Sequence, residues 1–267
     1  MAATRLQVAG IDSAKLDAEI ILAHTLRKNR TFLHAHGEDL LEQRQHEITN
    51  ARLQLRLDRT PVAYIIGHKE FYGHPFRVTP ATLIPRPESE MIITLIKQLV
   101  PKNIPLPRTP PQKLVDVGTG SGCLGITAKL ELPELDVTLL DISQHALKVA
   151  EFNKKHLKAD VHIQQSDLLS GYPLIADFIV ANLPYVDENW ERSIETKYEP
   201  EIALFAPNNG LYFIEKLILQ IPTHLTRGGY LLLEADPRQH QAIRELAKNR
   251  GLDHRQTRRF ILCFQRS

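Results

Sequence analysis

A short apolar run that ends in three closely spaced glycines constrains this chain more than any other feature. Residues 114–117 read Leu-Val-Asp-Val, and the turn that follows is Gly118-Thr119-Gly120-Ser121-Gly122. Glycine accepts positive φ and lets a ligand approach the backbone closely, and the apolar segment 124–132 behind the turn is compatible with a helix. We therefore predict a strand, a ligand-binding turn and a helix whose free N–H groups face the ligand.

The spacing of the glycines separates the possible cofactors. The turn has the pattern G-x-G-x-G, whereas a dinucleotide site needs G-x-G-x-x-G and a phosphate loop needs a lysine after its last glycine. Asp116, inside the strand, would repel a pyrophosphate and fits a cationic ligand better. Two roles stay open for Asp116: it supports the ligand, or it caps N–H groups of the glycine turn.

Two further strand ends carry polar residues at suitable distances. The strand 136–140 runs into Asp141, about twenty residues beyond the glycine turn, where α/β cofactor sites place a carboxylate on ribose hydroxyls. The run 161–164 leads to Asp167 and Leu168, a polar and an apolar side chain suited to surround an adenine ring. Taken in series, these strand ends and the turn predict an S-adenosylmethionine pocket formed by Gly118, Thr119, Gly120, Ser121, Gly122, Asp141, Asp167 and Leu168.

A polar tetrapeptide, Asn182-Leu183-Pro184-Tyr185, follows the apolar run 178–181. Ligands of open α/β sheets bind outside the carboxyl ends of the strands, so this segment predicts a reaction centre. We expect Asn182, Pro184 and Tyr185 to be catalytic, all four residues to contact the substrate, and Asn182 to touch the cofactor as well. The alternative is a plain turn, because Asn and Pro are common in turns.

With these motifs, the chain resembles the seven-stranded S-adenosylmethionine-dependent methyltransferases and, more narrowly, the release factor glutamine methyltransferase family. The segments that carry the closer resemblance are 59–67, 70–76, 83–90, 199–201, 203–204 and 209–211. The Pro-Arg-Pro-Glu stretch at 85–88 differs from the run of a sister family that methylates a ribosomal protein, so it favours release factors as substrate. This chain departs from the family's usual Asn-Pro-Pro-Tyr by having Leu183.

The resemblance implies transfer of a methyl group from S-adenosyl-L-methionine to the side-chain amide nitrogen, N5, of the glutamine in the Gly-Gly-Gln motif of peptide chain release factors. S-adenosyl-L-homocysteine would be the product. The Asn182 side-chain oxygen and the backbone carbonyl that the resemblance places at position 183 would accept the hydrogens of that amide and orient it. Leu183 keeps the carbonyl but lacks the fixed φ of proline. No general base is evident, and none is needed before the transfer.

Two other functions stay open. One is an adenine N6-methyltransferase acting on DNA or ribosomal RNA, because the tetrapeptide also resembles that of ribosomal RNA adenine dimethyltransferases and Tyr185 would stack equally well on a base. A formal net charge of only +2 argues against binding through many phosphates. The other is a non-catalytic cofactor-binding module, which the presence of Asn182, Pro184 and Tyr185 disfavours.

The order of the elements predicts an α/β fold in which a small helical N-terminal domain precedes a seven-stranded, doubly wound class I methyltransferase domain, which is Rossmann-like. We place a helical substrate-recognition domain at 1–70, a hairpin, helix and proline-rich linker at 71–111, and the S-adenosylmethionine-dependent domain at 112–267. Helical spacing at 12–27 and 39–57 and a helix starting at Pro87 support this division. The run 260–264 is expected to pair antiparallel beside the strand 230–234.

Composition supplies the remaining expectations. The two cysteines, Cys123 and Cys263, give neither a disulfide framework nor metal spacing, and the 12 histidines are scattered, so no metal is expected. No apolar run reaches the ~18 residues of a membrane span, and no export signal is evident. We expect a cytoplasmic monomer whose partners are release factors and which requires neither a membrane nor a nucleic acid.

Overall fold

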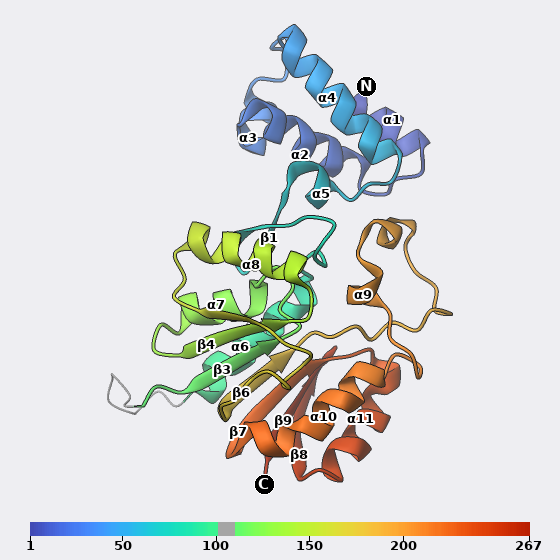
Figure 1. The fold of residues 1–267 in the computed structure, drawn as a ribbon. Helices are drawn as coiled ribbons and strands as arrows, with labels where there is room; N and C mark the ends of the chain where they lie inside the picture. The colour runs from blue at the N-terminus through green and yellow to red at the C-terminus, as the bar shows by residue number, and fades with distance from the viewer. Residues whose placement is uncertain (101–109) are drawn as a thin grey trace. The chain divides into compact units, whose positions relative to one another are not determined.

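The computed structural model describes residues 1–100 and 110–267 of the chain. These residues form two units (Figure 1). The helical unit contains residues 1–68 and 192–198, and the sheet unit contains residues 69–191 and 199–267, apart from the undescribed 101–109. Residues 101–109, which belong to the proline-rich linker predicted within 71–111, therefore lie outside the described residues.

The helical unit is built from α1 (Ala2–Val8), α2 (Ala14–Leu26), α3 (Arg30–Ala35), α4 (Gln43–Leu57), α5 (Val62–Ile66) and the 3-10 helix η2 (Ile194–Tyr198). Helices α2 and α4 confirm the helices predicted at 12–27 and 39–57. The other three α-helices were not predicted, because a helix of seven residues or fewer shows little periodicity. The core of the unit consists of the buried side chains of Leu6, Ile11, Ala14, Ile21 and Leu53.

A buried ion-pair cluster holds the helical unit together. Arg56 on α4 is 3% exposed, and its Nε donates to Asp17 Oδ2 on α2 over 2.6 Å. Its Nη2 donates to Glu195 Oε1 on η2, also over 2.6 Å. Residues 192–198 lie within the range predicted for the methyltransferase domain, and this cluster is one reason why they pack with the helices instead.

The sheet unit contains, among the described residues, a seven-stranded sheet with the order β5-β4-β3-β6-β7-β9-β8. Its strands are β3 (Lys113–Val117), β4 (Asp136–Asp141), β5 (His162–Gln165), β6 (Ala176–Ala181), β7 (Leu225–Glu234), β8 (Leu252–Arg258) and β9 (Ile261–Arg266). The first five strands in this order pair in parallel, whereas β9 is antiparallel to β7 and to β8. The arrangement confirms the predicted fold class and the antiparallel final strand.

Helices cover both faces of this sheet (Figure 1). Successive strand residues point to opposite faces: Leu114 packs in the cluster with α6 (Glu90–Leu99), α7 (Cys123–Glu131) and α8 (Gln144–Leu157). Val115 packs on the other face with α10 (Tyr212–His224) and α11 (His240–Lys248). The short helices of this unit are η1 (Pro87–Ser89), α9 (Glu201–Leu204) and η3 (Pro237–Gln239). Among the described residues, none of the helices combines the length and apolar character that crossing a membrane requires.

A two-stranded hairpin precedes the sheet, formed by β1 (His68–Phe71) and β2 (His74–Arg77). Tyr72 and Gly73 connect the strands with φ values of 52° and 79°. Two successive residues with positive φ are the signature of the type I′ turn, which matches the twist of a hairpin. The turn confirms the hairpin expected at these residues.

Replacing Arg56 by Met should destabilise the helical unit, because the change leaves the carboxylate of Asp17 buried without its cation. Loss of one partner of a buried pair costs about 3–5 kcal/mol. Hydrogen exchange of the amides in α2 and α4 measures the effect. The matched control is Arg30→Met, which removes the exposed pair of Arg30 with Glu19 and should cost much less than Arg56→Met, because water screens an exposed pair. Equal effects of the two changes would contradict this account of the cluster.

Candidate active site

The register of the parallel strands brings four strand ends to one edge of the sheet, and three of them carry a polar side chain. Val117 of β3 pairs with Leu140 of β4 on one side and with Ala181 of β6 on the other. Ala181 in turn pairs with Leu233 of β7. The residues that come next along these strands are Gly118, Asp141, Asn182 and Glu234. The strand order reverses between β3 and β6, which is where open α/β sheets bind their ligands.

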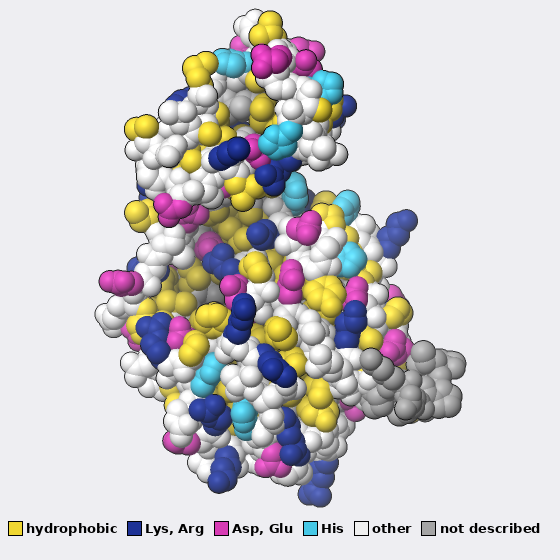
Figure 2. Space-filling view, turned by 180° about the vertical axis from the view of Figure 1, so that it is seen from behind, with side chains coloured by type: hydrophobic (Ala, Val, Ile, Leu, Met, Phe, Trp, Pro, Cys, Tyr) yellow, Lys and Arg dark blue, Asp and Glu magenta, His cyan; other side chains and the backbone are white. Residues whose placement is uncertain are grey.

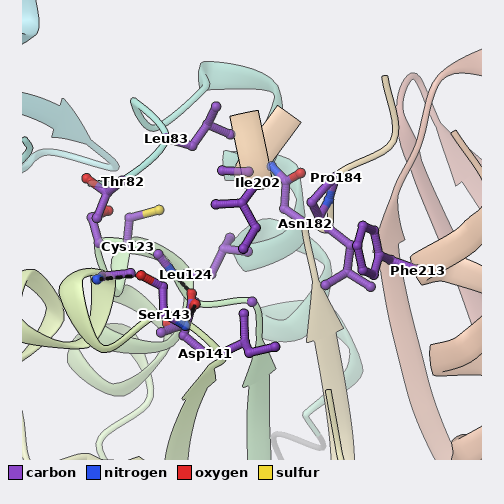
Figure 3. Close-up of a pocket in the computed structure, with 18 of the residues that line it drawn as sticks. Thr82, Leu83, Cys123, Leu124, Asp141, Ser143, Asn182, Pro184, Ile202 and Phe213 are labelled. Carbon is purple, nitrogen blue, oxygen red and sulfur yellow. Dashed lines mark hydrogen bonds between the residues drawn. The ribbon is translucent and has the colours of Figure 1, made fainter. Parts of the chain in front are cut away.

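A cavity of about 230 Å³ opens at this edge (Figure 3). The strand ends contribute residues 118–121, 141–143, 166–168 and 182–184 to its lining, and much of the rest comes from 81–83, 85, 86, 89, 202, 203 and 213. Figure 3 shows Asn182 and Pro184 together, apart from Asp141 and Ser143. The cavity thus brings together all the predicted site residues except Gly122, which is the N-cap of α7, and Tyr185.

The glycine turn has the conformation that its sequence predicts. Gly118 has φ +72°, and a Cβ at this position would lie 2.9 Å from Leu183 Cδ2. Gly120 has φ +57° and no atom within 4 Å of a Cβ position, so its backbone is open to a ligand. Gly118 is therefore needed where the reaction segment packs against the turn, and Gly120 where the turn meets the cavity.

Asp116 has a structural role in this arrangement. Its Oδ2 accepts hydrogen bonds from the Thr119 hydroxyl over 2.6 Å and from Gly125 N over 2.9 Å. The side chain is buried and is not part of the cavity lining, which favours the capping hypothesis over direct ligand support. Burial raises the pKa of this carboxyl group to about 6, although both hydrogen bonds oppose the rise.

Asp141 lies at the cavity and also orders the backbone around it. Its Oδ2 accepts from Gly120 N and its Oδ1 from Ser143 N, each over 2.8 Å. Each carboxylate oxygen can accept a second hydrogen bond, so both remain able to bind ribose hydroxyls. Leu168, which is buried, lines the cavity near the half-exposed Asp167. The two predicted adenine neighbours are thus in the lining.

Asn153 on α8 supports the glycine turn and was not predicted. This buried side chain donates to Ser121 O over 2.8 Å and to Arg77 O over 3.0 Å, and it accepts from Arg77 N over 2.8 Å. It therefore joins the hairpin to the glycine turn. Its helix carries no local signal for this role, because the contact with Arg77 spans 76 residues of sequence.

Glu199 fixes the opposite rim of the cavity. Its carboxylate, which is 3% exposed, accepts from Arg86 Nη2 over 2.6 Å and from Ile84 N over 3.2 Å. Two segments that carry the family resemblance, 83–90 and 199–201, therefore meet through this one side chain. Sequence inspection singled out both segments but assigned no role to either residue of the pair.

Ser89 and Glu234 stand behind the reaction segment and were also not predicted. Asn182 Nδ2 donates to Ser89 Oγ over 3.0 Å, and Ser89 Oγ donates to Glu234 Oε2 over 2.5 Å. The Tyr185 hydroxyl donates to Glu234 Oε1 over 3.1 Å, so it points away from the cavity lining. The position of Glu234 as the last residue of the strand beside β6 is the signal that would have identified it.

Cys123 lines the cavity, but its thiol is poorly suited to act as a nucleophile. Burial raises the pKa of its thiol to about 12, and the nearby Asp116 carboxylate raises it further. The thiolate is the nucleophilic form of cysteine, and it is scarcely populated near neutral pH at this pKa.

Replacing Asp116 by Asn should remove a pH dependence from the stability of the cofactor-free protein. The pKa of about 6 in the folded state exceeds the value near 4 of an unfolded chain, so the protonated form favours folding. That contribution is complete below about pH 4 and is lost as the pH rises through about 6. The free energy of unfolding of the wild type, relative to Asp116→Asn, should therefore fall by up to about 3 kcal/mol across this range. Urea titrations measure the difference, and a value independent of pH would contradict the assignment.

Two family models match the chain. The model of the PrmC N-terminal domain matches residues 1–67, and the model of the methyltransferase small domain matches residues 96–197. The chain is 36% identical to the release factor glutamine methyltransferase of Koribacter versatilis, over 90% of this chain and 87% of that protein. It is 34% identical to the protein of the same name in Escherichia coli, over 90% of this chain and 85% of the relative.

A solved structure shares the fold at lower sequence identity. The methyltransferase from Pyrococcus furiosus matches with a TM-score of 0.56 and 18% identity, over 82% of this chain and 98% of that one. This likeness supports the methyltransferase fold of the sheet and its helices. The two relatives from Koribacter versatilis and Escherichia coli match this chain over most of its length. They show that the chain belongs to the release factor glutamine methyltransferase family.

Proposed function

We propose that this protein transfers a methyl group from S-adenosyl-L-methionine to N5 of the glutamine in the Gly-Gly-Gln motif of peptide chain release factors. The observation that carries the proposal is the position of Asn182 in the cavity lining, on the strand adjacent to the glycine turn and apart from Asp141 (Figure 3). One end of the cavity thus suits a nucleoside, and the other suits a planar amide. The names of the two curated relatives support glutamine as the acceptor.

The residues of the cavity fit S-adenosylmethionine, which supplies the methyl group on a positively charged sulfur when bound. Asp141, which lines the cavity, would accept hydrogen bonds from the ribose hydroxyls, and the open backbone at Gly120 would allow close approach. Ile142 is 52% exposed and lines the cavity, so an adenine ring would cover its apolar surface. The two acidic side chains of the described lining, Asp141 and Asp167, suit a cationic ligand.

The reaction segment can hold a glutamine amide by its two hydrogens. The Asn182 side-chain oxygen and the Leu183 carbonyl act as acceptors, and Pro184 limits the flexibility of the segment between them and Tyr185. Leu183 is 3% exposed because its side chain packs against Gly118. This packing anchors the segment where the family usually has the fixed φ of proline. Leu183 is therefore compatible with an ordered, active site.

The transfer needs orientation more than proton abstraction. The amide nitrogen would take the methyl group as the bond from methyl to sulfur breaks, which releases S-adenosyl-L-homocysteine. The nitrogen would then be cationic and would lose its proton to water, so no base has to act first. Apolar side chains at the amide end, Leu83, Ile202 and Phe213, would exclude water when a substrate covers them. Burial raises the pKa of the Tyr185 hydroxyl, which keeps it protonated as a hydrogen-bond donor.

The surroundings of the cavity disfavour a nucleic acid substrate. Arg86 is the one cationic side chain among the described residues of the lining, and the buried Glu199 carboxylate neutralises it. On the face that Figure 2 shows, Lys and Arg side chains are scattered and separated by acidic, apolar and other side chains. Binding through phosphates needs a concentrated basic surface. A protein substrate does not, and the helical unit would supply the additional contacts that select a release factor.

Asn182→Ala should lower the rate of methyl transfer by about a hundredfold, because the substrate amide loses its orienting acceptor. Binding of S-adenosylmethionine should change little, since the ribose contacts remain. The assay is the transfer of labelled methyl groups to unmodified release factor, with calorimetry for cofactor binding. The matched control is Asn189→Ala, a change at an exposed asparagine a few residues along the same segment. Full turnover by a folded Asn182→Ala protein would contradict the proposed role.

The substrate itself is tested by adding four acceptors to the wild-type protein in parallel. These are the unmodified release factor, the same factor with its Gly-Gly-Gln glutamine replaced, ribosomal RNA and DNA. We expect label only in the intact factor. Label in the substituted factor would exclude this glutamine, and label in a nucleic acid would favour the adenine methyltransferase instead.

A further inference from the structure

A chain of hydrogen bonds links the reaction segment to a buried carboxylate that does not line the cavity. It runs from Asn182 Nδ2 through Ser89 Oγ to Glu234 Oε2. Glu234 is 1% exposed, and the second oxygen of its carboxylate accepts from the Tyr185 hydroxyl. Asn182 and Ser89 belong to the cavity lining, whereas Glu234 does not. Glu234 therefore acts on a bound substrate only through the residues that it holds.

The direction of these bonds follows from the number of hydrogens. A carboxylate only accepts hydrogen bonds, so the single hydrogen of the Ser89 hydroxyl must point at Glu234. Ser89 Oγ then has only lone pairs left for Asn182, so the NH₂ group of Asn182 must face it. The Asn182 side-chain oxygen is consequently turned the other way, and no donor among the described residues reaches it.

We propose that Glu234 is a positioning residue of the methyl transfer, which acts through Ser89 to keep the side-chain oxygen of Asn182 available to the substrate amide. This inference rests on the proposed function, in which Asn182 accepts a hydrogen from the glutamine NH₂ group. An asparagine turned by 180° about its last side-chain bond would present its own NH₂ group. Two donors would then face each other, and the substrate amide would lose its acceptor.

Opposing influences act on the pKa of the Glu234 carboxyl group. Burial is the main cause that raises the pKa of Glu234, and the nearby Glu88 carboxylate raises it as well, whereas the hydrogen bonds from Ser89 and Tyr185 oppose the rise. No cation pairs with Glu234 in the described part of the chain, so these neutral donors stabilise its charge. The Tyr185 hydroxyl donates to Glu234 Oε1, the carboxylate oxygen that does not bond to Ser89.

Glu234→Gln tests the role with little change of shape. The new NH₂ group can donate to Ser89 Oγ, which frees the Ser89 hydrogen to point at Asn182 and favours the turned amide. We expect the rate constant kcat to fall about tenfold to a hundredfold, the loss that one misdirected hydrogen bond produces. The affinity for S-adenosylmethionine and the KM for release factor should change less than about twofold. The substitution disturbs the orientation of the reacting amide and leaves the contacts that bind the cofactor and the release factor in place.

Ser89→Ala breaks the same chain at its middle link and should give a similar loss of kcat. The double variant should be no slower than the slower single variant, because both changes remove one shared function. Thr94→Ala is the matched control: it removes a half-buried hydroxyl that bonds, among the described residues, only to the Glu90 carbonyl of its own helix, and it should retain full activity. The inference would be overturned if the losses of kcat in the two single variants added up in the double variant, or if the substitutions changed KM instead of kcat.

A measurement without substrate separates this inference from the proposed function. The side-chain amide signal of Asn182 in a nitrogen-15 spectrum, assigned by its absence in Asn182→Ala, reports the bond to Ser89. Its hydrogen exchange should be faster in Glu234→Gln than in the wild type. An unchanged exchange rate would overturn the inference. Absence of methyl transfer by the wild type to any release factor would overturn the proposed function, and the amide signal would then decide on Glu234 alone.

Discussion

The parallel pairing of β6 with β3 on one side and β7 on the other is the constraint on which the site depends. Because Ala181 is in register with Val117 and with Leu233, Asn182 is placed between the glycine turn and Glu234. The same pairing puts the point where the strand order reverses directly under the cavity. A shift by one residue would turn every side chain of β6 to the other face of the sheet and separate Asn182 from its partners.

Local sequence patterns predicted the parts of this arrangement that depend on neighbouring residues. Alternating apolar residues gave the central strands, and the glycine spacing gave a turn whose conformation requires positive φ at Gly118 and Gly120. Asp141 was identifiable because a fixed distance separates it from that turn, and Asn182 because it follows a buried strand. For Asp116 the sequence left two roles, and only the bonds to Thr119 and Gly125 distinguish them.

Contacts between distant segments could not be predicted in the same way. Ser89 and Glu234 are 145 residues apart, and Arg86 and Glu199 are 113 apart, so no local pattern connects either pair. The membership of 192–198 in the helical unit similarly depends on Arg56, which is 139 residues from Glu195. In each case a buried charged group, the carboxylate of Glu234 or Glu199 or the guanidinium of Arg56, bonds to a partner from another segment, because an unpaired buried charge would be costly. Polar contacts of this kind therefore determine how segments that are far apart in the sequence meet.

The central claim is that the carboxyl edge of β3, β4 and β6 binds the cofactor and presents Asn182 to a glutamine amide. A crystal structure with S-adenosylhomocysteine and a glutamine-containing release factor fragment tests this claim most directly. The account predicts ribose hydroxyls on Asp141 and the substrate amide nitrogen within hydrogen-bond distance of the Asn182 side-chain oxygen. A cofactor bound away from the glycine turn, or a glutamine amide that does not contact Asn182, would contradict it.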